Sequence, residues 1–192
     1  MNLGECLGFY FASFLSQQNY QTMKKIITVV AIALSISTAN AQNIVASNVS
    51  FEIGNMGFKT VEGTFSDIQG EIAFDESNLS QASFDVCIPV KTVNTENEKR
   101  DQHLLEEDFF HEAKYPTICF TAKGVNKTKK GYVVEGTLKM RGVSKSVSIP
   151  FTFANNTFNG SLELERLDYQ LGPNGGFMIG KTVVLQISCQ VA

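Results

Sequence analysis

Apolar and polar residues alternate along most of the chain beyond residue 48, so that every second side chain is apolar. The longest run covers residues 143–153 (Val-Ser-Lys-Ser-Val-Ser-Ile-Pro-Phe-Thr-Phe) and is interrupted only by Lys145. A period of two predicts strands with one apolar and one polar face, which is typical of antiparallel sheets. Strands are predicted near residues 48–55, 60–66, 69–75, 82–93, 116–125, 131–141, 143–154, 157–166 and 181–191.

This pattern predicts an all-β fold. Long strands joined by turn-forming residues at 75–78, 129–131 and 155–156 either close into a barrel or stack as a sandwich. Several strands exceed ten residues, which is long for a small sandwich and favours an extended antiparallel barrel of about eight strands. The alternation fits a cavity as well as a packed interior, and a packed interior is the simpler interpretation of the sequence alone.

The stretch 96–112 interrupts the strands and predicts a short helical cap for one end of the barrel. Thr95 and Glu98 fit a capping box, so the helix should begin near Glu96. Leu104 and Leu105 give it an apolar edge, and an aspartate at position 108 can cap a second short turn. A proline at position 116 ends the segment, because the residue before a proline is held in an extended conformation.

The first 41 residues are interpreted as a leader and not as part of the fold. A positive start at residues 23–25 precedes an apolar run at 26–36, which is too short to span a bilayer. An Ala-x-Ala sequence then predicts cleavage between Ala41 and Gln42. The protein is therefore expected to be exported, into a periplasm or out of the cell.

Cleavage would leave residues 42–192 as a single domain. Residues 1–22 are interpreted as a misassigned start, with translation beginning at residue 23; the alternative is a genuine extension whose aromatic residues give it membrane affinity. The full chain carries a net charge of −3 and has no basic cluster, which argues against nucleic acid as a partner. If the protein associates with itself, a two-fold homodimer is the expected assembly.

Three cysteines, Cys87, Cys119 and Cys189, follow the leader. Their spacing matches no zinc or haem motif, and no metal or other cofactor is predicted. By parity, Cys87 and Cys119 lie on the outer face of two strands joined by the cap, and Cys189 lies on the inner face. The first two either form a cross-strand disulfide or remain free thiols.

Four motifs, in order, resemble the YceI-like family. Strands at 51–53, 61–65 and 70–75 resemble its opening strands, and residues 95–120 contain its Thr, Arg-Asp-x-His-Leu and Tyr-Pro elements. Residues 136–145 resemble its Gly-x-Leu-x-x-x-Gly-Val-Thr-Lys turn, and residues 166–172 its Arg-x-x-x-x-x-Gly element. Asn55 stands where relatives often have a histidine. The resemblance implies a lipocalin-like barrel that binds a polyisoprenoid inside, as a lipid carrier or scavenger with transient membrane contact.

If the interior is a cavity, parity assigns its lining. The predicted lining residues are Phe65, Phe74, Phe84, Val86, Ile88, Ile118, Phe120, Leu138, Met140, Val147, Ile149, Phe151, Leu162, Leu164, Leu185 and Ile187. The predicted mouth residues are Arg100, His103, Leu104, Phe109, Arg166 and Tyr169. Arg100 either binds a ligand head group or forms an ion pair with the neighbouring aspartate that fixes the helix over the rim. Asp168 beside Arg166 is expected to clasp a loop.

The sequence leaves two other function classes open. One is an interaction or stress protein with a solid core, which acts through its outer surface. The other is a metal-dependent hydrolase that uses His103, His111, Asp101 and Glu107. The two histidines are eight residues apart and do not share one helical face, and the sequence contains no His-x-x-x-His motif. The sequence therefore predicts a protein that is not an enzyme.

Overall fold

The structure is a computed structural model that describes residues 41–55, 57, 59–174 and 178–192. The predicted leader and the alternatives for residues 1–22 lie outside these residues, while Ala41 and Gln42 form the first strand. The strands are β1 (Ala41–Gln42), β2 (Ile44–Asn55), β3 (Lys59–Ser66), β4 (Gln69–Ala73), β5 (Ser83–Pro89), β6 (Thr117–Lys123), β7 (Asn126–Thr128), β8 (Gly131–Met140), β9 (Val143–Ala154), β10 (Thr157–Glu165) and β11 (Ile179–Val191). Within the described residues, the α-helix is α2 (Glu98–Leu105), and the short 3-10 helices are η1 (Leu79–Gln81), η2 (Val90–Thr92) and η3 (Arg166–Tyr169).

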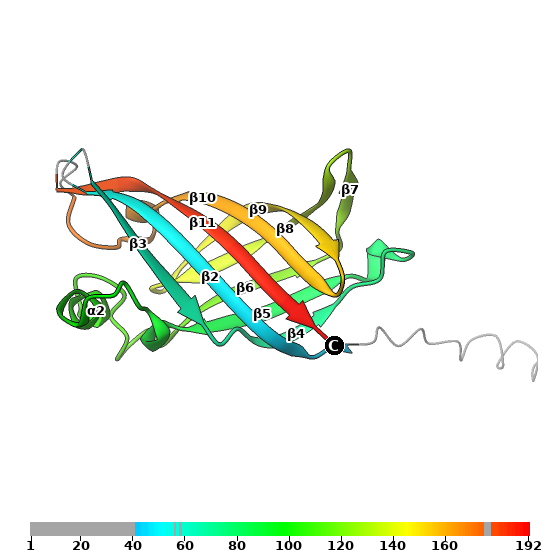
Figure 1. The fold of residues 1–192 in the computed structure, drawn as a ribbon, viewed down its shortest axis with the longest axis horizontal. Coiled ribbons are helices and arrows are strands. Elements are labelled where there is room, and N and C mark those ends of the chain that lie inside the picture. Colours follow the sequence, from blue (N-terminus) through cyan, green and yellow to red (C-terminus); the bar gives the residue numbers. More distant parts are fainter. Residues whose placement is uncertain (1–40, 56, 58, 175–177) are drawn as a thin grey trace, which may run out of the picture. The chain divides into compact units, whose positions relative to one another are not determined.

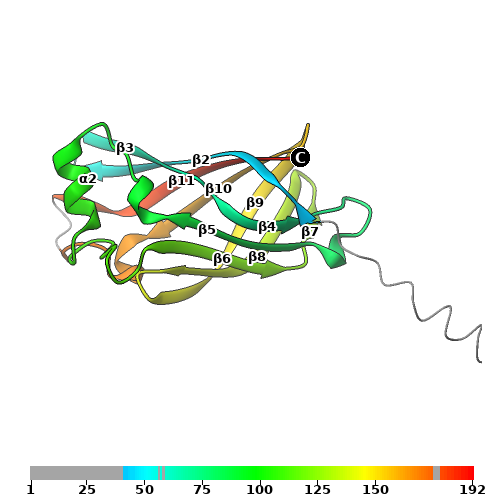
Figure 2. The ribbon, with the colours of Figure 1, turned by 90° about the horizontal axis from the view of Figure 1, so that it is seen from below.

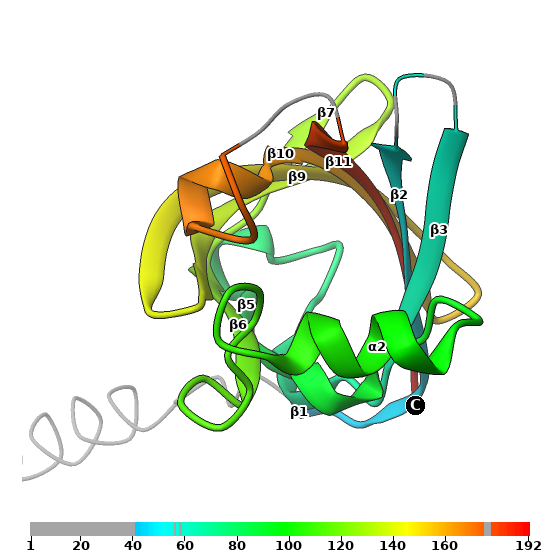
Figure 3. The ribbon, with the colours of Figure 1, turned by 90° about the vertical axis from the view of Figure 1, so that its left-hand side faces the viewer.

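All strand pairs are antiparallel and form one curled sheet in the order β1-β4-β5-β6-β8-β9-β10-β11-β2-β3, with β7 beside β8 (Figure 1). Only Asn43 separates β1 from β2, so this part of the chain carries the sheet from β4 round to β11. Figure 3 looks along the resulting barrel, with α2 lying across its end. The predicted all-β, lipocalin-like barrel with a short helical cap is confirmed, although the described sheet has eleven strands and not about eight, because the short strands β1 and β7 add to it.

The register explains why alternate residues share a face. Leu162 on β10 lies opposite Leu185 on β11, which lies opposite Phe51 on β2. The apolar side chains of neighbouring strands therefore form continuous rows on the inner face, while their polar neighbours face outward. These rows make up the apolar core of the barrel.

The ring of strands has a seam. Strand β3 pairs along one side with β2, but in the described part of the chain its other side meets the rest of the barrel at a single backbone bridge, between Thr64 and Asn94. The two backbone hydrogen bonds of that bridge measure 2.8 and 2.9 Å. Thr92 adds side-chain hydrogen bonds to the backbone of Ser66. Backbone pairing therefore closes the barrel at the β1–β4 end, whereas the seam at the cap end depends on η2 and its neighbours.

The cap is an insertion between the adjacent strands β5 and β6 (Figure 2). Its two ends meet where the Val90 amide donates to the Pro116 carbonyl at 2.8 Å. The strand predicted over 82–93 ends at Pro89, because the chain turns into η2 to reach the seam. Just outside the insertion, Cys87 and Cys119 lie directly opposite each other in the β5–β6 register and form a disulfide.

The prediction that the helix begins near Glu96 is wrong. Glu96 has a φ of +59°, which is incompatible with a right-handed helix, and α2 starts two residues later. Asn97 is the N-cap, and its side-chain oxygen accepts from the Arg100 amide at 3.1 Å. The Thr95 hydroxyl, which the capping box required, donates instead to Asp101 at 2.5 Å. Among the residues described, no helix is both long enough and apolar enough to cross a membrane.

Candidate functional site

The barrel interior holds a cavity of about 440 Å³, so the side chains do not fill it. This finding contradicts the simpler interpretation of a packed interior. All the predicted lining residues except Phe74 and Val147 border the cavity. Almost all of the wall is hydrocarbon, with polar side chains gathered at the cap end. A cavity of this size is typical of small-molecule sites, which range over about 300–1,000 Å³.

The cavity runs along the barrel axis. Strand β11 contributes lining residues from Ile179 to Cys189, a stretch of about 33 Å at about 3.3 Å per residue. With the strands tilted by about 40°, that corresponds to a depth of about 25 Å. Such a shape suits one long, narrow apolar ligand better than a compact one.

Several lining residues were not among the predicted ones, and six of them come from β2 and β3, where the prediction included only Phe65. Those from the two strands are Val49, Phe51, Ile53, Gly54, Asn55 and Val61. The same alternation that identified the other strands marks Val49, Phe51 and Ile53, so that signal was present in the sequence. Phe110, Leu171 and Thr95 also line the cavity, but they come from loops, where periodicity carries no information about direction.

Three predicted site residues lie elsewhere. Phe74 packs beyond the end of the cavity, because β4 ends at Ala73 and the chain turns there. Val147 packs against the core without bordering the cavity. Tyr169 was expected at the barrel edge but is fully buried with 2% exposure, and burial raises the pKa of its hydroxyl.

Arg100 and Asp101 meet at Thr95 and do not pair with each other, so the expected ion pair is not what fixes the cap. Arg100 donates from Nε to the Thr95 hydroxyl and from Nη2 to the Thr95 carbonyl, both at 2.7 Å. Asp101 accepts from the Thr95 amide at 2.9 Å and from its hydroxyl. This arrangement joins the first turn of α2 to the chain that crosses the seam. In the described part of the chain, Nη1 of Arg100 has no hydrogen-bond partner.

Arg166 is a buried cation on the opposite side of the mouth, with 3% exposure. Its guanidinium donates to the carbonyls of Gly180 (2.7 Å), Leu171 (2.5 Å) and Pro173 (3.0 Å), with a fourth contact to Ile179. Burial lowers its pKa, against a smaller opposing effect of Glu165. Arg166 therefore holds together the loop that follows η3.

The predicted clasp between Asp168 and Arg166 is absent. Asp168 contacts Lys145 at 3.3 Å instead, on the outside of the barrel. All three nitrogens of the Arg166 guanidinium donate to backbone carbonyls instead, those of Leu171 and Pro173 in the loop and those of Ile179 and Gly180 at the start of β11. The pair was expected from sequence proximity, which does not reveal that one side chain is buried and the other is exposed.

The cap contacts the loop after η3 through Phe109 and Gly172. The Gly172 amide donates to the Asp108 carbonyl at 2.8 Å, and Gly172 has a φ of +69°. A Cβ at this position would lie 2.6 Å from the Phe109 ring. On the other side of the cap, the Phe110 ring stands edge-on to Phe65 at 5.6 Å. These contacts hold the cap over the mouth.

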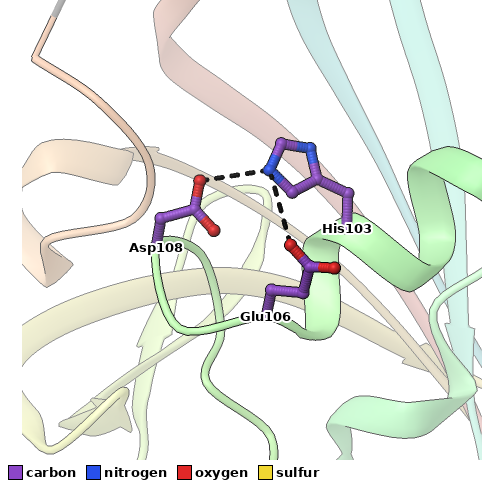
Figure 4. A group of neighbouring side chains, drawn as sticks. All are labelled: His103, Glu106 and Asp108. Atoms are coloured by element: carbon purple, nitrogen blue, oxygen red, sulfur yellow. Dashed lines mark hydrogen bonds and ion pairs between the residues drawn. The ribbon is translucent and has the colours of Figure 1, made fainter.

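His103, Glu106 and Asp108 cluster at the end of α2 and in the turn that follows (Figure 4). Nε2 of His103 lies 3.1 Å from an Asp108 oxygen and 4.0 Å from a Glu106 oxygen, and all three side chains are exposed. The ring of His103 also stands edge-on to Phe109 at 4.9 Å. The donor set fits a divalent cation, but the contacts with Asp108 and Phe109 already account for the orientation of His103.

The residues of the hydrolase alternative do not converge. His111 packs against Tyr115 and lies outside the His103 cluster. Asp101 accepts hydrogen bonds from Thr95, and Glu107 is not part of the His103 cluster. The contacts of His103 to Asp108 and Phe109 orient its side chain within the cap.

The sequence matches a known family profile and several known proteins. The family profile described as the YceI-like domain matches residues 40–191. A UPF0312 protein of Photorhabdus laumondii is 35% identical over 127 residues, which cover 63% of this chain and 66% of that one. The chain spans between 53% and 66% of the length of the first curated relatives it matches.

Two solved structures share the fold at lower identity. BcnA of Burkholderia cenocepacia has a TM-score of 0.71 and 23% identity, over 76% of this chain and 96% of that one. A polyisoprenoid binding domain from Saccharophagus degradans has a TM-score of 0.58 and 17% identity, over 80% of this chain and 99% of that one. At these identities the comparison shows the architecture of the barrel.

Proposed function

Because this chain belongs to the YceI-like family, we propose that it is an exported protein that binds one polyisoprenoid, or an amphiphile of similar shape, inside its barrel. The tail lies in the apolar cavity, and the polar head lies at the cap. The protein acts as a carrier or scavenger that makes transient contact with membranes. The observation that carries this proposal is the cavity of about 440 Å³, whose wall is hydrocarbon everywhere except near the cap.

The physics of the wall favours a lipid over water as the occupant. Water in a cavity needs polar partners, and only the mouth of this one supplies them. A buried methylene group gains about 0.8 kcal/mol relative to water, so a long tail would bind strongly from solution. A bilayer offers the tail a comparable gain. Exchange between protein and membrane is therefore close to balanced, as a carrier requires.

The mouth orients the ligand. Arg100 and Arg166 border the cavity at its cap end, and neither has a carboxylate partner among the described ion pairs. All three guanidinium nitrogens of Arg166 donate to backbone carbonyls, whereas Nη1 of Arg100 has no partner among the described residues and is available for an oxygen of the head group. The shared fold of the polyisoprenoid binding domain supports an isoprenoid as the ligand class.

Native mass spectrometry of protein purified without detergent tests the proposal. We expect an adduct with the mass of one lipid, which organic extraction releases for identification. Leu162→Asn places an amide in the wall and should greatly reduce the adduct. Ser161→Asn places the same group one residue away on the exposed face and should leave the adduct unchanged.

The comparison between these two variants separates lipid binding from general damage to the fold. If both variants are folded and retain lipid equally, the inner face does not hold the ligand. If the wild-type protein carries no lipid and takes up none from vesicles, the proposed function is wrong.

A further inference from the structure

A cluster of aromatic rings closes the end of the cavity that lies away from the cap. It consists of Phe74, Phe84, Tyr132, Phe151, Phe153 and Phe158. Phe74 lies at its centre, with ring centroids 5.0 Å from Phe153, 5.2 Å from Tyr132 and 5.3 Å from Phe158. Most of the rings meet edge to face, the arrangement that aromatic pairs favour in protein cores.

The cluster has two layers. Phe84, Phe151 and Phe158 border the cavity, while Phe74 and Phe153 pack behind them and do not. Tyr132 stacks on Phe151 at 5.4 Å, and its hydroxyl donates to Glu76, which is exposed. The second layer therefore separates the cavity from the far end of the barrel.

The structure assigns a role to this cluster: we propose that it is a floor that sets the length of the ligand tail. This inference rests on the proposed function. A tail that reaches the floor has no further apolar wall to contact, so additional isoprene units must stay outside the mouth or fold back on the chain. Aromatic rings that interlock in this way change their positions less readily than flexible side chains such as methionine. The limit on the length of the tail is therefore sharp.

The cap end imposes no comparable limit. Its rim combines polar side chains with half-buried apolar ones, and it is where the ligand head meets water. Phe51, on β2, offers a matched aromatic residue near that end. It borders the cavity and lies 5.5 Å from Phe65, which in turn contacts the cap. Removing its ring widens the cavity without making it deeper.

The test compares Phe74→Ala and Phe51→Ala across isoprenoid alcohols of increasing length, from farnesol through geranylgeraniol to solanesol. Binding to the full chain is measured by displacement of a fluorescent lipid. Phe74→Ala should raise the affinity for solanesol relative to farnesol by about tenfold, because room for two more methylene groups is enough for such a change. Phe51→Ala should change the affinity for all the alcohols by a similar factor.

Phe74→Leu and Phe153→Leu test the same inference in case Phe74→Ala does not fold. Both remove a ring from the second layer and keep an apolar side chain, so they should shift the preference in the same direction by a smaller factor. An unchanged length preference in folded second-layer variants, or an equal shift in Phe51→Ala, overturns the inference while the proposed function stands. Wild-type protein that binds none of the alcohols overturns both.

Discussion

Removing the disulfide between Cys87 and Cys119 should measurably destabilise the barrel. The two cysteines are 32 residues apart, and the loop that they close contains the whole cap. In the chain-entropy description, a cross-link of this span removes about 12 cal/mol/K from the unfolded chain. That corresponds to about 3.7 kcal/mol of stabilisation at 25 °C. This value is an upper limit, because strain in the native state and residual structure in the unfolded chain both reduce the stabilisation.

The perturbation is the double variant Cys87→Ser with Cys119→Ser. The expected loss is about 2–4 kcal/mol in the free energy of unfolding, with the melting temperature lower by about 5–15 °C. Urea unfolding followed by circular dichroism measures the loss, with fully reduced wild-type protein as a second way to break the same bond. Direct pairing in the β5–β6 register remains, so the folded state should keep its secondary structure.

A double variant as stable as the oxidised wild type would refute this reasoning. The unfolded chain would then not be constrained by the link, or the reduced protein would retain the same contacts when unfolded. A variant that loses lipid but keeps its stability would show that the disulfide acts directly on the cap and not on the unfolded chain.

Three further predictions concern the mouth and the buried thiol. Gly172→Ala should lower stability by about 1–3 kcal/mol, because Gly172 has a positive φ and the new Cβ would collide with Phe109; calorimetry measures it, and Phe109→Leu should relieve part of the loss. Arg166→Met should cost about 3 kcal/mol or more in urea unfolding, because it leaves buried carbonyls without donors, and an equally stable variant would contradict the assigned role. Burial raises the pKa of Cys189 from 9.0 to about 11, so the folded protein retains a proton that the unfolded chain releases, and stability should fall as the pH rises from about 9 through 11. Cys189→Ala should lack this part of the pH dependence in unfolding midpoints, and a persisting loss would assign it to other groups.

The strands could be predicted from the sequence because their alternation reports directly on the sheet faces. The run at 143–153 predicted the face that β9 presents to the interior, and Ile149 and Phe151 do border the cavity. The start of α2 could not be predicted in the same way. Thr95 and Glu98 satisfied the local pattern of a capping box, but the Thr95 side chain is engaged by Arg100 and Asp101 across the turn.

The presence of the cavity could not be predicted from the alternation of apolar and polar residues. Alternation fixes which way a side chain points and says nothing about whether the opposite walls meet. The position of Phe74 depends on the turn after β4, and the four carbonyls around Arg166 come from the loop after η3 and from the start of β11, whose proximity no periodicity describes. Both follow from tertiary contacts between segments that lie apart in the sequence.

The incomplete pairing of β3 affects how the barrel can respond to its contents. In a fully hydrogen-bonded cylinder, the girth is fixed by strand number and stagger, and widening it means breaking a whole row of backbone bonds. Here the ring of strands is open near the cap, and among the described residues only the bridge between Thr64 and Asn94 joins its two sides through backbone hydrogen bonds. The barrel can therefore widen at the cap end by a shift of side chains across the seam. The opposite end keeps its diameter, because its strands are joined by backbone hydrogen bonds.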